Sequence, residues 1–340
     1  MVLDDAWNRT TQESGHAGVL PVHIAALALG VINCLLNGLI CVAFQSNRRL
    51  LTRCHLYIFY AFAITNCFSG FFTIPTLINL FVHNNLNCPR WTIIIGSGFE
   101  IGLDRMRKVL AVMIALERTF AVYCPSRYYV SDHFGFVKNA CAVGIIWGSI
   151  DSVAMILEND LATIRMHCVT TSSSGYIFHT YFLISSLGFD VALVVVYAFF
   201  IVKLCMMSES VTITQSRVNA NAMSKNYRQA NSLTVMVVLS VILFSAVPCA
   251  LYFHDLIEKK IVFMEAGPVV TIGYHLYGCT SFFLYSWRHR GIRAAMIKTF
   301  KRLTRREEPL SFNYTIAKSN KNVTKSMLAA VRRKGPMPLS

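Results

Sequence analysis

The residues of this chain that could do chemistry include charged side chains set within an apolar segment. They are Glu100, Asp104, Arg105, Arg107 and Lys108. On a helix, an acid pairs with a cation three or four residues further on, so Asp104 is expected to pair with Arg107 or Lys108. The alternative is that these charges form the polar floor of a ligand cavity. The spacing favours the ion pairs, and the two interpretations are compatible.

Other charges lie in or beside apolar segments. Glu117 and Arg118 are adjacent near the end of the same segment, as either an interfacial anchor or a functional pair. Asp151 and Asp190 are single acids in two later segments, where each either serves a ligand site or bonds a neighbouring helix. At about 100° per residue, one helical arc is expected to face the other helices. That arc carries Glu100, Asp104, Arg107, Lys108 and Arg118.

No catalytic or metal-binding pattern accompanies these charges. The chain has no Gly-rich phosphate loop, no paired His and Glu at zinc spacing and no Cys-x-x-Cys. We therefore expect a protein that is not an enzyme, without a metal or a cofactor.

Composition points to a membrane. Hydrophobic residues make up 54% of the 340 residues and charged residues 14%, whereas a soluble domain carries about 25% charged residues. The net charge of +15 does not indicate nucleic-acid binding, because the basic residues lie mainly in loops and the tail rather than on a soluble face.

Seven segments are apolar and long enough to span a bilayer, which takes about 20 residues. We expect a seven-transmembrane, all-α bundle. The expected spans are Val19–Phe44, Leu56–Val82, Trp91–Tyr123, Phe136–Leu157, Tyr176–Cys205, Leu233–Phe253 and Ile261–Trp287.

The distribution of Lys and Arg among the loops predicts an outside amino terminus and a cytoplasmic tail. Residues 1–18 form the outer terminus, without a signal-peptide pattern, and Asn8 lies in a glycosylation sequon. The membrane domain covers 19–287. A basic amphipathic helix over 288–306 is expected on the cytoplasmic membrane surface, followed by a disordered cytoplasmic tail over 307–340.

Two cysteines, Cys88 and Cys168, lie on the expected outer face, while most of the others fall within spans. An oxidising compartment favours a disulfide between them over two free thiols. Pro248 removes a backbone hydrogen bond from the sixth span and is expected to kink it.

Several segments resemble one family of membrane receptors. They are LAVMIALERTFAVYCP (110–125), QANSLTVMVVLSVILFSAVP (229–248), EAGP (265–268) and YGC (277–279). Together they are similar to the nematode seven-transmembrane chemoreceptors, and most closely to the serpentine receptors of class BC, within the rhodopsin-like G-protein-coupled receptors.

The resemblance implies roles for particular residues. Glu117 and Arg118 stand where such receptors carry the acid and arginine that restrain the inactive state and meet the G protein. Pro248 resembles their helix-six proline, and Tyr285 the tyrosine that ends their helix-seven motif. The sequence departs from the family pattern at three positions. They are Thr119, directly after the arginine, and Ser281 and Phe282, in the helix-seven motif.

The function implied is chemosensory. A small environmental molecule would bind from outside in a cavity that includes Glu100, Asp104, Arg107, Asp151 and Asp190, and a heterotrimeric G protein would bind inside. The expected location is the plasma membrane, in sensory-neuron cilia, with membrane lipids as partners and a receptor oligomer left open. The alternatives are a ligand-gated channel, which requires the opposite orientation, and a transporter, which more often shows internal repeats.

Overall fold

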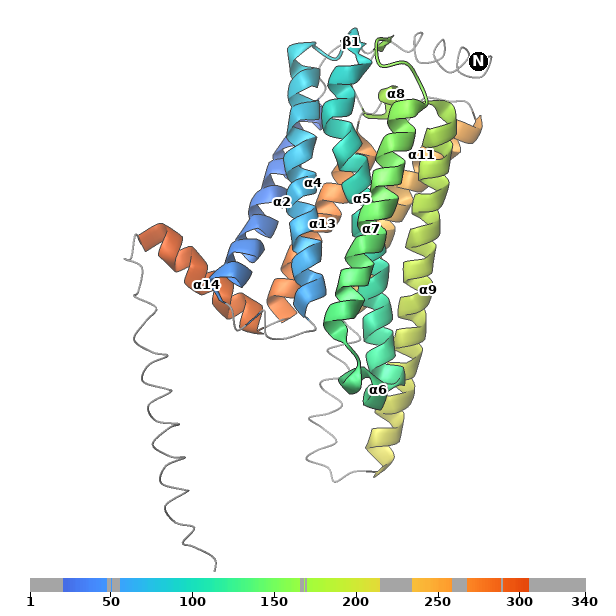
Figure 1. The fold of residues 1–340 in the computed structure, drawn as a ribbon. Coiled ribbons are helices and arrows are strands. Elements are labelled where there is room, and N and C mark those ends of the chain that lie inside the picture. The colour runs from blue at the N-terminus through green and yellow to red at the C-terminus, as the bar shows by residue number, and fades with distance from the viewer. Residues whose placement is uncertain are drawn as a thin grey trace, which may run out of the picture. The chain divides into compact units, whose positions relative to one another are not determined.

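The computed structural model describes residues 21–47, 50, 56–165, 168, 170–214, 234–258, 268–288 and 290–305. Seven long helical segments in this part of the chain form a bundle (Figure 1). They are α2 (Pro21–Ser46), α4 (Tyr57–Val82), α5 (Arg90–Tyr123), α7 (His133–Leu157), α9 (Tyr176–Thr214), a sixth segment over 234–258, and α13 (Val269–Arg288). The short elements are β1 (Cys88–Pro89), α6 (Pro125–Val130), β2 (Ile164–Arg165), α8 (Thr170–Ser173) and α14 (Arg290–Arg305).

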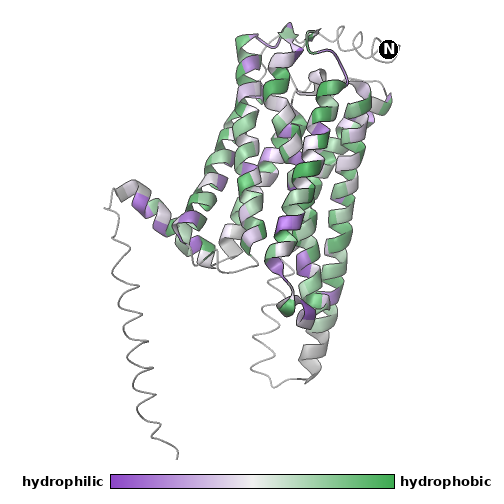
Figure 2. Ribbon diagram, viewed as in Figure 1, coloured by the Kyte–Doolittle hydropathy of each residue, from purple (hydrophilic) through white to green (hydrophobic). Residues whose placement is uncertain are grey.

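Five of the described helices are long and apolar enough to cross a membrane: Pro21–Ser46, Tyr57–Val82, His133–Leu157, Tyr176–Met207 and Thr234–Asp255. Apolar residues dominate these helices, as Figure 2 shows. A sixth, Val269–Leu284 in α13, is shorter. The remaining long helix, α5, has 34 residues, which exceeds the roughly 20 that a span needs, but it carries the charged residues that lower its hydropathy.

Helix α5 lies at the centre of the bundle. It packs against α4, α7 and α9, while α2 packs against α4 and α13, and the sixth segment contacts α9 and α13. The main apolar core includes Phe62, Leu110, Ile114, Tyr197 and Phe282. A side chain in the middle of α5 can therefore reach several other helices.

Small residues allow α5 and α7 to approach closely. A Cβ on Gly148 would lie 2.3 Å from the carbonyl oxygen of Gly102, and a Cβ on Gly102 would lie 2.7 Å from Ser152 Oγ. Ser152 Oγ in turn donates a hydrogen bond to the carbonyl of Gly98, at 2.7 Å. Small residues at helix interfaces are a common way to bring two membrane helices together.

The sixth segment changes its winding in the middle. A π-helical stretch, η2 (Ile242–Ala246), leads into α11 (Val247–Glu258), and Pro248 is the second residue of α11. A proline cannot donate a backbone hydrogen bond, and π turns occur as single-turn interruptions of α-helices. Gly273 of α13 packs here, since a Cβ on it would lie 2.2 Å from the carbonyl oxygen of Phe244. This local winding places Ser245 inside the bundle, where it is buried.

One end of the bundle, which we call the disulfide end, is closed by loops. Strand β1 pairs antiparallel with β2, and a disulfide joins Cys88 to Cys168 with a Cα–Cα separation of 5.4 Å. Asn85 has a φ of 57°, in the left-handed region that Asn tolerates better than most residues. Its Oδ1 accepts a hydrogen bond of 3.0 Å from the backbone N–H of Cys168. The loop between α7 and α9 is thus held against the start of α5.

The observed elements follow the expected plan with shifted bounds. The short helix expected over 288–306 is α14, and apolar and polar residues alternate along it (Figure 2). The seventh helix is described from Val269, and residues 261–267 of its expected range lie outside the described residues. The terminus 1–18, with Asn8, and the tail 307–340 also lie outside them.

Candidate functional site

Three buried ion pairs involve the middle of α5, and we call the residues that form them the charged layer. Its residues are Asp104, Arg105, Arg107, Lys108, Asp151 and Asp190. Arg105 Nε lies 2.5 Å from Asp151 Oδ2 on α7, Lys108 Nζ lies 2.9 Å from Asp190 Oδ2 on α9, and Arg107 pairs with Asp104 within α5. All six are buried. Buried charges are tolerated when they are paired, so each of these six charges has a partner of opposite sign inside the bundle.

Arg105 is enclosed by aromatic rings. Its guanidinium carbon lies 5.1–5.7 Å from the ring centroids of Trp147, Tyr181, Phe182 and Phe189. The Tyr181 hydroxyl donates a hydrogen bond of 3.0 Å to Asp151. Cations are attracted to ring faces at this distance. The Arg105 pair therefore ties α5 to both α7 and α9.

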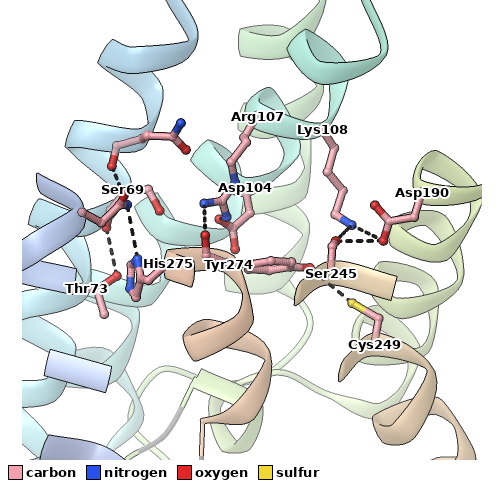
Figure 3. A network of polar contacts seen from close by, with 12 residues as sticks. Ser69, Thr73, Asp104, Arg107, Lys108, Asp190, Ser245, Cys249, Tyr274 and His275 are labelled. Atoms are coloured by element: carbon pink, nitrogen blue, oxygen red, sulfur yellow. Dashed lines mark hydrogen bonds and ion pairs between the residues drawn. The ribbon is translucent and has the colours of Figure 1, made fainter. Parts of the chain in front are cut away.

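Lys108 connects three helical segments. Its ammonium donates hydrogen bonds to Asp190 Oδ2 and to Ser245 Oγ, both at 2.9 Å, and Ser245 Oγ donates to the same Asp190 oxygen at 2.8 Å. Figure 3 shows this triangle of side chains from α5, α9 and η2. The π-helical winding of η2 thus gives the sixth segment a direct polar bond to α5.

Arg107 connects α5 to α13. Besides pairing with Asp104, it donates a hydrogen bond of 3.1 Å to the carbonyl of Tyr274, and its guanidinium carbon lies 4.8 Å from the centroid of that tyrosine's ring. The Tyr274 hydroxyl lies 3.5 Å from Cys249 Sγ on α11, as Figure 3 shows. Through Tyr274, the charged layer reaches the two helical segments that follow α9.

A cavity of about 60 Å³ lies between the charged layer and the disulfide end. Residues of α5, α8, α9, α11 and α13 line it. The wall includes two acids and four rings, which are Glu100, Asp104, Phe178, Phe182, Tyr252 and Tyr274. Asp104 and Tyr274 belong to this wall and also contact Arg107. A molecule in the cavity would therefore touch the charged layer directly.

Arg90, at the start of α5, is hydrogen-bonded to the backbone at the end of α7 and in the segment that leads from α7 to α9, at the disulfide end. It donates hydrogen bonds to the backbone carbonyls of Ser173 at 2.8 Å and of Met155 at 2.5 Å, and also to that of Asn159. Carbonyls near the carboxyl end of a helix have no partner within it, and a cation there is stabilising. Arg90 thus fastens the end of α7 and the short helix α8 to α5.

The opposite end of α5, which we call the Glu117 end, holds its charges less closely. Glu117 is buried, and its Oε1 accepts a hydrogen bond of 3.4 Å from the Tyr128 hydroxyl and lies 3.5 Å from His133 Nδ1. The guanidinium carbon of Arg118 lies 5.4 Å from the ring centroid of Phe59, and its side chain is partly exposed. This end joins α5 to α6, α7 and α4.

The sequence-predicted site residues that the structure describes fall into five places. Glu100 and Asp104 line the cavity, whereas Arg107, Asp151 and Asp190 lie in the charged layer rather than in the cavity wall. Glu117 and Arg118 lie at the other end of α5, Pro248 follows η2, and Cys88 and Cys168 are bonded to each other. Tyr285 belongs to α13, but its side chain lies outside the described residues, as does Asn8.

Sequence reasoning missed part of this arrangement. Of the two partners offered for Asp104, the structure selects Arg107, and Lys108 pairs with Asp190 instead. The inward arc predicted from the sequence does not include Arg105, which is fully buried in the structure. The available signal was that Asp151 and Asp190 each needed a cation and that α5 alone carries three within one turn. The roles of Ser245 and Tyr274 had no sequence signal.

Comparison with known proteins places the chain in a family. A seven-helix bundle with several membrane-spanning segments defines a multi-pass membrane protein. The family model described as serpentine type 7TM GPCR chemoreceptor Srbc matches residues 17–281, so the chain belongs to this family of chemoreceptors. No curated protein matches the chain. Among the described residues, no group of three or more His, Cys, Asp or Glu side chains is arranged to hold a metal ion.

Proposed function

We propose that the protein is a chemosensory receptor that binds a small environmental molecule in the cavity beneath the disulfide end and activates a heterotrimeric G protein at the Glu117 end. In this proposal the disulfide end faces outside, and the receptor resides in the plasma membrane of a sensory neuron, in its cilia. The tail after α13 is cytoplasmic, and α14 lies on the inner membrane surface, where its basic residues meet anionic lipids.

The observation that supports the proposal most is the shared wall between cavity and charged layer. Asp104 and Tyr274 line the cavity, and both contact Arg107. A ligand that changes the position of either residue changes the contacts between α5 and α13. A ligand shifts a conformational equilibrium only by binding one state better than another, and we propose that its contacts with Asp104 and Tyr274 differ between the two states.

The sixth segment is the element that we propose carries the signal to the Glu117 end. Lys108 bonds η2 through Ser245, and η2 precedes the proline of α11. We propose that ligand binding shifts the sixth segment relative to α5 at this winding defect. The Glu117 end then opens for the G protein. Glu117 and Arg118 act there as the restraint, in line with the roles implied by the family resemblance.

A reporter experiment tests the proposal. Cells that express the receptor with an amino-terminal tag are screened with volatile and soluble compounds, with calcium and cyclic-nucleotide responses as the readout. Antibody access to the tag on intact cells, compared with access to a carboxyl-terminal tag, reports orientation. We expect the amino-terminal tag alone to be reached and at least one compound to raise the signal. A carboxyl-terminal tag reached on intact cells would contradict the proposed orientation and favour the channel alternative.

A matched pair of variants tests the signalling end. Arg118→Ala is expected to abolish the response at unchanged surface density, because it removes the cation proposed to meet the G protein. Arg127→Ala removes an exposed cation of α6 at the same end and is expected to keep the response. Equal responses from both variants would remove Arg118 from the mechanism.

A further inference from the structure

Glu100 is a buried acid beside the charged layer that takes no part in the layer's ion pairs. The charged layer holds three cations and three acids, each cation paired with one acid. Glu100 lies one helical turn before Asp104 and is 4% exposed. Its Oε2 atom has no hydrogen-bond partner within the described part of the chain. A buried carboxyl oxygen without a partner is costly, so its retention calls for an explanation.

The Glu100 carboxyl group borders the cavity. Glu100 and Asp104 both line it, but Asp104 is already paired with Arg107. With every pair ionised, the three cations and the three paired acids cancel, so an ionised Glu100 would add one negative charge that no cation of the layer compensates. Arg107 points to Asp104 and to the Tyr274 carbonyl and is not part of the wall. The ionisable side chains of the wall are therefore the acids Glu100 and Asp104, together with His179 and two tyrosines, and the described residues of the wall include no lysine or arginine.

Four phenyl or phenol rings also line the wall, beside aliphatic and hydroxyl side chains. Phe178 and Phe182 come from α9, Tyr252 from α11 and Tyr274 from α13. Ring faces attract cations, and clusters of rings around an ammonium group are a recurring way to bind one. A carboxylate beside several rings gives such a group both a counter-ion and a substitute for its hydration shell.

We propose that the cavity binds a small organic cation, with the ammonium group of the ligand paired to Glu100 and enclosed by these four rings. The inference rests on the proposed receptor function and adds the chemical class of its ligand. A cavity of about 60 Å³ exceeds several-fold the roughly 10–15 Å³ that one water needs on the same measure. It suits a compact amine or quaternary ammonium head group.

The test measures thermal unfolding of the purified full-length receptor in detergent. The probes are tetramethylammonium chloride, tert-butanol as a neutral molecule of similar shape, and sodium chloride at matched ionic strength. A ligand that binds only the folded state raises the unfolding midpoint with concentration. We expect a saturable rise with tetramethylammonium and none with the other two probes.

Variants locate the binding. Glu100→Gln is expected to weaken tetramethylammonium binding by at least about thirtyfold, the effect of removing one partner of a buried charge pair. Phe178→Leu keeps the acid but removes one ring, and should weaken binding about tenfold. It provides an independent measurement if Glu100→Gln does not fold. Asp160→Asn removes an exposed carboxylate of the α7–β2 loop and should leave binding unchanged, which controls for attraction to surface charge.

The outcomes separate this inference from the proposed function. No saturable shift with tetramethylammonium, an equal shift with tert-butanol, or full binding by both the Glu100 and Phe178 variants would overturn the cation inference. If reporter cells nevertheless respond to a neutral compound through Arg118, the receptor function stands and only the ligand class is wrong.

Discussion

The two charged regions of α5 differ in how tightly their residues are held. In the charged layer each cation has a buried carboxylate partner, and the two pairs that join α5 to its neighbours are 2.5 and 2.9 Å long. At the Glu117 end the contacts of Glu117 are 3.4 and 3.5 Å long, and Arg118 is partly exposed. The layer has the contacts of a structural support, and the Glu117 end has those of a part that can rearrange.

The comparison predicts its largest effect in the charged layer. Asp190→Ala leaves the Lys108 ammonium buried without its carboxylate and should destabilise the folded receptor by about 3–5 kcal/mol. The measurement is the yield and the unfolding midpoint of the detergent-solubilised protein. The double variant Lys108→Met, Asp190→Leu removes both charges and should recover most of the loss. A single variant as stable as the wild type would show that the pair does not support the bundle.

The disulfide should matter nearly as much. Cys88→Ser together with Cys168→Ser frees a loop whose ends are 80 residues apart, and losing such a bridge costs about 2–5 kcal/mol. We expect a lower unfolding midpoint and a lower surface density. Cys205→Ser, at an exposed free cysteine of α9, serves as the control. If the control lost as much stability as the double variant, the bridge would not be the cause.

Helix packing beside the layer should be sensitive to a single methyl group. Gly148→Ala places a Cβ against the backbone of Gly102 and should cost about 1–3 kcal/mol through overpacking. Gly188→Ala in α9 meets nothing within 4 Å and should be neutral or stabilising by up to about 1 kcal/mol, because Ala favours helices. The measurement is the unfolding midpoint of each variant. Equal midpoints would contradict the close approach of α5 and α7.

The smallest effect on stability is expected at the Glu117 end. Glu117→Gln keeps the shape of the side chain and weakens the long contacts to Tyr128 and His133, so it should change stability by about 1 kcal/mol, the net value of one hydrogen bond. It should raise signalling without ligand, because it weakens the proposed restraint. A large fall in stability with unchanged basal signalling would show that Glu117 supports the fold and does not restrain signalling, which contradicts the contrast between the two regions.

Sequence reasoning reached the fold because membrane spans and loop charges are local signals. The 34-residue length of α5 was predictable despite its charges, since the apolar part after Lys108 is too short to span alone. The pairing of Cys88 with Cys168 followed from their shared face. The partners of Arg105 and Lys108 could not be predicted from the sequence, because they depend on how α7 and α9 are rotated about their axes relative to α5. The cavity walls depend on the π-helical winding before Pro248, which the sequence signals only as a kink.

The central claim is that the Glu117 end of α5 reports the state of the cavity to a G protein. Nucleotide exchange on a purified heterotrimeric G protein, measured with membranes that hold equal amounts of wild-type, Glu117→Gln or Arg118→Ala receptor, tests it most directly. The account predicts exchange without ligand that is highest for Glu117→Gln, lower for the wild type and absent for Arg118→Ala. Equal exchange by the three receptors, above that of receptor-free membranes, would contradict it.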